Sequence, residues 1–182
     1  MAPIQKITRL IIVAFFGAIM FVTRVFVPPP IDKMLIVVDA VLLAISALFL
    51  KKAGATSVAA VGGILAGLWL PTFLPFSLIF TILYGVIVDF FILALGVKAT
   101  QKGVPQKTLV IAMALSTLAI ATISYFVFSY YPNSYVTSLS LAFVPRVDIL
   151  NILVVFMGTV TGAVAGYAAS YLWNKYLKNI AQ

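Results

Sequence analysis

The acidic side chains of this sequence are few, and they limit the chemistry that the chain can perform. Only four acids occur among the 182 residues, and there is no Glu, Cys or His. These absences exclude thiol chemistry, disulfides, Cys/His metal sites and a His-based catalytic triad. No GxxxxGK[ST] loop is present, which excludes ATP hydrolysis by that route. Any carboxylate chemistry must use Asp32, Asp39, Asp89 or Asp148.

Two of these acids lie inside strongly hydrophobic runs. Asp39 interrupts IVVDAVLLAIS, and Asp89 interrupts SLIFTILYGVIVDFFILALG at residues 77–96. Placing an acid at the centre of a membrane helix costs roughly 2.5–3.5 kcal/mol on insertion scales, so such residues usually have a role. For Asp39 we expect either contact with a ligand or organisation of a binding pocket.

Asp89 ends a stripe of small and polar residues on one helical face. Ser77, Thr81 and Gly85 precede it at four-residue spacing, and Gly96 follows seven residues later. Residues at these spacings share a face, and a polar face of a membrane helix turns towards the bundle interior. Two interpretations remain open. Asp89 either accepts hydrogen bonds from neighbouring helices and fixes their packing, or it lines the floor of a solute pocket.

Asp89 and Tyr84 lie at different depths in the same hydrophobic run. Asp89 lies about twelve residues into its run, or roughly 18 Å at the helical rise, deeper than the other acids. Tyr84 borders the same stripe nearer the start of the run. We therefore expect Tyr84 to contact a solute directly, with Asp89 at or beneath the pocket floor.

The composition requires these residues to be positioned by membrane helices. Hydrophobic residues make up 64% of the chain and charged residues only 9%, which predicts an integral membrane protein. Period-2 alternation, typical of β-barrel spans, is absent. We predict an all-α integral membrane protein, a single domain over residues 1–182 with six transmembrane helices in one bundle. The spans are approximately Leu10–Val27, Met34–Leu50, Ala53–Leu70, Ser77–Gly96, Thr108–Tyr130 and Val147–Trp173.

The distribution of basic residues predicts the orientation of these helices. One set of helix ends holds nine of the twelve basic residues and the other only three. By the positive-inside rule the first set is cytoplasmic, with both termini inside a cell (plasma) membrane and the first run retained as a helix. The net charge of +8 then reflects topology and anionic headgroups, so no nucleic-acid partner is expected. The outer basic residues are Arg24, Lys33 and Arg146.

The unusual polar and aromatic residues gather in the predicted outer half. Each has an ordinary alternative. Arg24 could lie at the membrane interface, Trp69 could belong to an aromatic belt, and Asp148 could cap the last helix. Arg146 and Asp148 could also form a local loop pair. The candidate binding residues of this half are Arg24, Asp39, Trp69, Arg146, Asp148 and Asn151.

Small residues recur at four-residue spacing in three of the predicted helices. Gly158, Gly162 and Gly166 form a doubled GxxxG, Ala55, Ala59 and Gly63 follow the same spacing, and Ala14 and Ala18 form an AxxxA. Such spacing lets helix backbones approach closely, so packing within the chain is the first interpretation. One of these faces could instead dock another membrane subunit.

The chain resembles the substrate-binding S components of energy-coupling-factor (ECF) transporters. The resemblance covers nearly the whole chain and rests on its size, its topology, AFFGA at 14–18 and LKKAGATSVAAVGGILAGL at 50–68. It implies a vitamin or precursor bound in the outer half beneath the outer loops. It also implies that Ala14 and Ala18 contact a transmembrane T subunit, which joins two ATPases. The chain itself would be no enzyme and would need no cofactor or metal.

The resemblance also suggests a substrate class. GVIVD at 85–89 and a Tyr-rich stretch before the last helix are similar to S components for thiamine and its hydroxymethylpyrimidine precursor. Trp69, Tyr84 and Tyr125 would then stack on a flat ring. Asp39, Asp89 or Asp148 would hydrogen-bond an aminopyrimidine or balance a thiazolium. The lack of Glu and His departs from several vitamin-binding patterns and argues against the cobalt and nickel relatives.

Two other classes remain as alternatives. A small membrane enzyme acting on lipid headgroups would use clustered aspartates to bind Mg²⁺, whereas the aspartates here are scattered along the chain. A stand-alone secondary transporter would favour an inverted repeat or broken helices, and neither is apparent in the sequence.

Overall fold

Six α-helices account for almost all of the structure. It is a computed structural model and describes residues 3–27, 35–51, 53–69, 76–100, 103–130 and 148–178. Side chains are described at 7–27, 35–51, 53–69, 78–100, 103–127 and 155–178. The helices are α1 (Pro3–Val25), α3 (Ile36–Leu50), α4 (Gly54–Trp69), α5 (Phe76–Ala94), α6 (Gln106–Tyr130) and α7 (Asp148–Leu172), followed by the π-helical turn η2 (Trp173–Leu177).

The predicted all-α fold is confirmed, and each predicted span corresponds to one helix. The largest boundary difference is at α1, which begins at Pro3 and not at Leu10. Three helical segments are long and apolar enough to cross a membrane: Ile7–Val25, Gln106–Val127 and Val155–Leu177. The other helices are apolar but shorter. At 1.5 Å per residue, the 15 residues of α3 extend about 22 Å, less than a bilayer core of about 30 Å.

The outer surface of the helices is apolar, which agrees with a location in a membrane. Large apolar side chains are exposed on three different helices: Leu10 is 68% exposed, Phe90 61% and Phe156 64%. A water-soluble bundle would place polar residues at such positions. Together with the three long apolar helices, this surface indicates membrane localisation.

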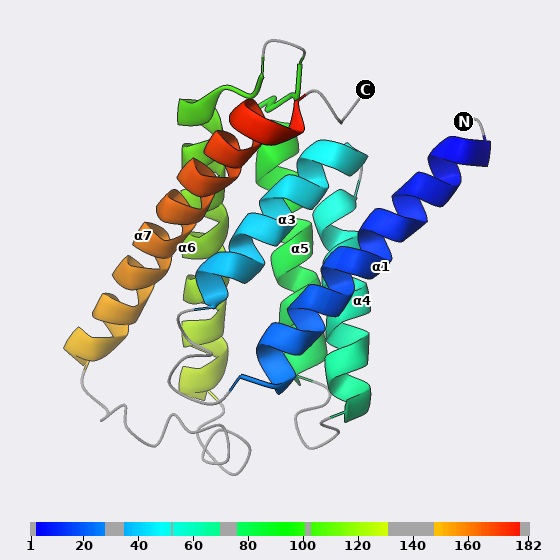
Figure 1. Cartoon of the computed structure of the whole chain (residues 1–182). Helices are drawn as coiled ribbons and strands as arrows, with labels where there is room; N and C mark the ends of the chain where they lie inside the picture. Colours follow the sequence, from blue (N-terminus) through cyan, green and yellow to red (C-terminus); the bar gives the residue numbers. More distant parts are fainter. Residues whose placement is uncertain are drawn as a thin grey trace.

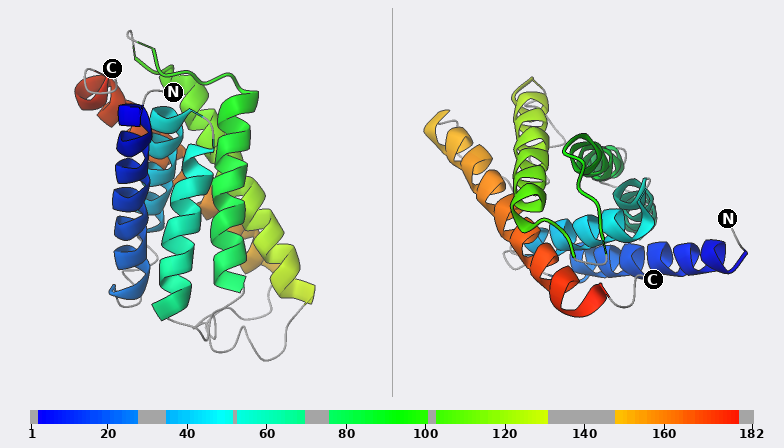
Figure 2. Two further views of the ribbon diagram at one scale, coloured as in Figure 1. Left: turned by 90° about the vertical axis from the view of Figure 1, so that its right-hand side faces the viewer. Right: turned by 90° about the horizontal axis from the view of Figure 1, so that it is seen from above.

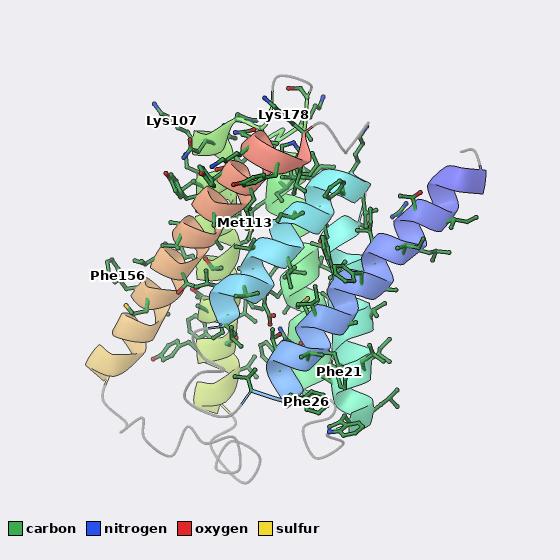
Figure 3. The ribbon with its side chains drawn as sticks, in the orientation of Figure 1. Phe21, Phe26, Lys107, Met113, Phe156 and Lys178 are labelled. Atoms are coloured by element: carbon green, nitrogen blue, oxygen red, sulfur yellow. The ribbon has the colours of Figure 1, made fainter. Side chains whose placement is uncertain are left out.

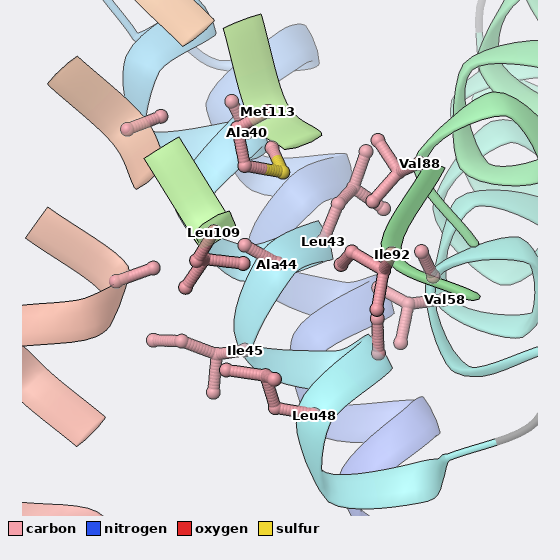
Figure 4. Packing of buried hydrophobic residues seen from close by; sticks show 14 of the residues in the cluster. Ala40, Leu43, Ala44, Ile45, Leu48, Val58, Val88, Ile92, Leu109 and Met113 are labelled. Atoms are coloured by element: carbon pink, nitrogen blue, oxygen red, sulfur yellow. The ribbon is translucent and has the colours of Figure 1, made fainter. Parts of the chain in front are cut away.

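Helix α3 occupies the middle of the bundle (Figures 1 and 2). It contacts α1, α4, α5 and α7, while α6 and α7 pack against each other along their lengths. Its sequence has no polar face, and a helix that is hydrophobic all round is expected to be buried. Leu43 and Ala44 are fully buried there, with Ala44 beside Leu109 of α6 and Leu43 beside Val88 of α5 (Figure 4).

The two ends of the bundle differ in charge. The start of α1, the end of α3 and η2 lie at one end (Figures 1 and 2). Lys107 and Lys178 lie there too, whereas Phe21 and Phe26 lie towards the other end (Figure 3). We call the first the basic end; its described basic residues are Arg9, Lys51, Lys98, Lys107, Lys175 and Lys178. The other is the opposite end.

A side chain that the sequence did not single out joins two segments at the basic end. Asn174 Oδ1 accepts a hydrogen bond from Val104 N at 2.7 Å, and Asn174 Nδ2 donates to Val104 O at 3.2 Å. The Asn174 amide therefore pairs with Val104 as a neighbouring backbone strand would. Phe49 and Trp173 pack edge to face beside it, with ring centroids 4.7 Å apart. These contacts fix η2 against the loop before α6.

The doubled GxxxG packs α7 against α6, as its first interpretation predicts. An added Cβ at Gly162 would lie 2.5 Å from Met113 O and would also collide with Thr117 Oγ1. A Cβ at Gly166 would lie 2.8 Å from Val110 Cα. At Gly158 the nearest atom would be Ala121 Cβ, at 3.2 Å. Glycine therefore allows the backbones of α6 and α7 to approach at two points where alanine does not fit.

We expect Gly162→Ala to destabilise the bundle and Gly158→Ala to have little effect. The new methyl at 162 meets a backbone carbonyl that cannot move aside, and overpacking of this kind costs about 1–3 kcal/mol. At 158 a modest contact is offset by the better helix propensity of alanine, worth about 0.5–1 kcal/mol. Thermal unfolding of both variants in detergent checks this. Equal melting temperatures for the two variants would contradict the packing seen between α6 and α7.

Candidate polar ligand site

An ion pair and three hydroxyl residues lie together where α1, α3 and α5 meet. Arg24 Nε donates to Asp39 Oδ2 at 2.9 Å, and Thr23 Oγ1 lies 2.9 Å from Asp39 Oδ1. Arg24 Nη1 donates to Thr81 Oγ1 on α5. We call Thr23, Arg24, Asp39, Thr81 and Tyr84 the three-helix polar cluster.

Three of these residues come together because they lie at the ends of two consecutive helices. Thr23 and Arg24 are in the last turn of α1, and Asp39 is in the first turn of α3. The chain reverses direction between them, so these two turns meet at the opposite end of the bundle. Thr81 lies on α5 at the same level. Sequence reasoning named Arg24 and Asp39 separately as candidates and did not pair them.

Burial makes this ion pair costly to break. The side chain of Asp39 is 8% exposed and that of Arg24 is 29% exposed. A charge withdrawn from water needs a partner and further hydrogen bonds, and both residues have them here. The Thr23 hydroxyl is also 2.9 Å from Met20 O. Since a hydroxyl has one proton, it can donate to Asp39 or to Met20 at any moment.

Tyr84 extends the cluster with a buried hydroxyl. The residue is 7% exposed, and no described residue forms a hydrogen bond with its hydroxyl. Tyr84 follows Thr81 by three positions on α5 and so lies on the same face of that helix. Nearly all buried polar groups in proteins are hydrogen-bonded, so an exception of this kind calls for a water or a ligand.

Asp89 lies outside the three-helix polar cluster and forms hydrogen bonds with the beginning of α4. Its carboxylate accepts hydrogen bonds from Ala55 N at 3.1 Å, from Thr56 N at 2.8 Å and from Thr56 Oγ1 at 2.6 Å. These donors are at the beginning of α4, where backbone N–H groups have no partner within the helix. Asp89 therefore caps α4 from a neighbouring helix, and its negative charge is favourable at this terminus.

The cap adjoins a turn with unusual backbone angles. Lys51 and Ala53 have φ values of 62° and 52°, a region that costs residues other than glycine about 1–3 kcal/mol. Asp89 anchors the residues that follow this turn. Asp89 lies near the basic end, and the helix-packing interpretation describes its contacts with α4. A place at the floor of a solute pocket stays a prediction.

The predicted stripe on α5 does face another helix, with one exception. Thr81 is buried, and a Cβ at Gly85 would lie 2.7 Å from Ala59 Cβ of α4. The side chain of Ser77 lies outside the described residues. Gly96 does not belong to the stripe, because it follows the end of α5, has a φ of 63° and borders open space.

The remaining candidates do not join the cluster in the described part of the chain. Trp69 is 60% exposed and packs against Phe21 and Phe26, with centroids 6.2 and 5.8 Å away. This arrangement agrees with its aromatic-belt alternative. Tyr125 is half-buried on α6, beside Phe126. Three predicted positions have side chains outside the described residues: Arg146, Asp148 and Asn151.

The AxxxA face of α1 is exposed. Ala14 and Ala18 face outwards, whereas Gly17 between them packs on α4, where its Cβ would lie 2.6 Å from Val61 Cγ1. Leu10 and Phe15 flank the alanines and are 68% and 61% exposed. Within the described residues, the packing interpretation therefore holds for Gly17 and not for the two alanines.

Sequence reasoning missed two kinds of residue. Thr23 was passed over, although a hydroxyl beside an intramembrane arginine is a usable signal. Thr56 and Asn174 gave no signal, because each acts on a segment distant in the chain. No group of three acidic, His or Cys side chains comes together among the described residues to hold a metal ion.

The chain was compared with protein families, with curated proteins and with solved structures, and no match was found.

Proposed function

We propose that this protein is the solute-binding subunit, or S component, of an ATP-driven ECF-type importer. Its ligand is a small vitamin or vitamin precursor, with thiamine or hydroxymethylpyrimidine as the first candidates. All six helices span the cell membrane and the basic end faces the cytoplasm, together with both termini. The observation that carries the proposal is the three-helix polar cluster, which combines an ion pair with a buried tyrosine hydroxyl that no described residue hydrogen-bonds.

Charge supports this orientation. Six of the seven basic residues with described side chains lie at one end, with Arg24 the exception, and the positive-inside rule assigns that end to the cytoplasm. Arg24 and the cluster lie at the other end, where a solute arriving from outside would meet them first. Intramembrane ionisable residues commonly mark the path or the site of a solute.

The test is to purify the protein in detergent and titrate it with thiamine, hydroxymethylpyrimidine, riboflavin and biotin. The same preparation, made from the native membrane, is searched for a co-purifying T subunit and ATPases. We expect at least one ligand to bind at micromolar concentration or below, and we expect the ATPases to be present. Absence of both would overturn the proposal.

Substituting Ala14 and Ala18 by Leu should abolish assembly and leave ligand binding intact. Both positions are exposed and lie away from the cluster, so larger side chains change only the surface offered to another helix. A steric cost of about 1–3 kcal/mol corresponds to a loss of about 5-fold to 150-fold in the co-purified T subunit. Ala94→Leu, at an exposed alanine of α5, is the matched control. Loss of ligand binding in the Ala14 and Ala18 variants would contradict this assignment of α1.

A stand-alone secondary transporter is the second candidate, and the Asp39–Arg24 pair favours it. A buried acid whose protonation releases an arginine is a device that proton-coupled carriers use. Uptake by the purified chain into liposomes, driven by a proton gradient without ATPases, would support this candidate. The S component predicts no uptake in that assay.

A further inference from the structure

The polar cluster offers more hydrogen-bond donors than acceptors to a ligand. Both Asp39 oxygens already face donors, from Thr23 and from Arg24. Arg24 uses Nε and Nη1, and none of the described residues accepts a hydrogen bond from Nη2. The Tyr84 hydroxyl can donate as well, and no described residue accepts a hydrogen bond from it. A ligand that completes this cluster must bring acceptor atoms.

The charge of the cluster further limits which ligands can bind. Arg24 and Asp39 neutralise each other, so the cluster has no net charge to attract a cation. A positive group beside Tyr84 would approach the guanidinium without gaining a carboxylate that is free of other partners. A neutral or negative acceptor, by contrast, gains charge-assisted hydrogen bonds from Arg24.

The Arg24 side chain is partly accessible to a ligand. The side chain of Arg24 is 29% exposed, so a ligand can reach the guanidinium while Asp39 stays covered at 8%. The Tyr84 hydroxyl has almost no exposed surface, so a ligand reaches it only when neighbouring side chains move apart. Direct contact between Tyr84 and a solute stays a prediction.

We infer that the three-helix polar cluster binds a small ligand without net positive charge, through an acceptor atom that receives hydrogen bonds from Arg24 and from the Tyr84 hydroxyl. The inference rests on the proposed function and narrows its substrate class. Of the two first candidates it selects hydroxymethylpyrimidine, which is neutral and has ring-nitrogen acceptors, over thiamine, which has a permanent thiazolium charge.

The experiment compares these two probes, which share an aminopyrimidine ring, by calorimetric titration at pH 8. We expect hydroxymethylpyrimidine to bind at least about tenfold more tightly than thiamine. Tyr84→Phe should weaken its binding by about tenfold, the usual worth of one hydrogen bond to a ligand, without lowering the melting temperature. Tyr167→Phe, at an exposed tyrosine of α7, is the matched control and should change neither.

Two results would overturn the inference while leaving the proposed function in place. Thiamine could bind as tightly as hydroxymethylpyrimidine, or Tyr84→Phe could leave affinity unchanged, which would mean that the hydroxyl serves only the fold. The carboxylates biotin and pantothenate complete the set of acceptor probes. If no acceptor probe binds, the inference fails, and co-purification with a T subunit and ATPases then decides separately whether the proposed function stands.

Discussion

Asp39→Ala is expected to be among the most damaging single substitutions in this chain. Removing the carboxylate leaves Arg24 charged, partly buried and without its ion-pair partner. Breaking a buried pair costs about 3–5 kcal/mol, and the 29% exposure of Arg24 places the loss near the lower value. Thermal or denaturant unfolding in detergent measures this loss.

A second variant separates the lost pair from the lost carboxylate. Asp39→Ala combined with Arg24→Met removes both charges and keeps similar volume at position 24. Replacing a buried pair by apolar residues is often neutral in stability, so the double variant should recover most of the loss. It should not recover hydroxymethylpyrimidine binding, because Arg24 is absent. If the double variant is as unstable as Asp39→Ala, the carboxylate stabilises the fold by another route.

Asp89→Ala is expected to cost about 3 kcal/mol for a different reason. It removes three hydrogen bonds at the beginning of α4, where a lost cap costs about 1 kcal/mol and each unsatisfied buried donor about 1–3 kcal/mol. Thr56→Val removes only the hydroxyl bond and should cost about 1 kcal/mol. Comparison of the two melting curves isolates the contribution of the two backbone N–H groups.

Ligand affinity shows which interpretation of Asp89 is right. Asp89→Asn keeps the shape of the side chain but loses acceptor capacity, so we expect lower stability and hydroxymethylpyrimidine affinity within about twofold of the parent. A role in ligand contact predicts the reverse, a loss of affinity with unchanged stability. That result would return Asp89 to the binding site.

The sequence was most informative where a property depends on local pattern. Apolar runs bounded by proline, glycine and charge predicted six helices, since helix formation and exclusion from water both act over neighbouring residues. Spacing was sufficient for the helix faces as well. Gly158, Gly162 and Gly166 were expected to pack and do so, and Thr81 and Gly85 were expected to face inwards and do so.

The candidate site was predictable only in part. Arg24, Asp39 and Tyr84 were chosen because charge and hydroxyl groups are expensive inside a membrane, which is a property of each residue alone. Their pairing depends on how α1, α3 and α5 cross. For Trp69 the sequence left both an aromatic belt and stacking on a ligand open; its packing on Phe21 and Phe26 agrees with the belt, and stacking stays a prediction.

Asp89 shows both what the local sequence determines and what only the packing of helices determines. The sequence by itself determined that this carboxylate lies on an inward face of α5 and must have a partner, because helical periodicity and the cost of burying an acid are local. Only the tertiary structure decided which partner. The turn at residues 51–53 brings the open N–H groups of α4 to within 2.8–3.1 Å of the carboxylate, from more than thirty positions away in the chain. A contact between segments that distant depends on the crossing of whole helices, and no pattern within either segment encodes it.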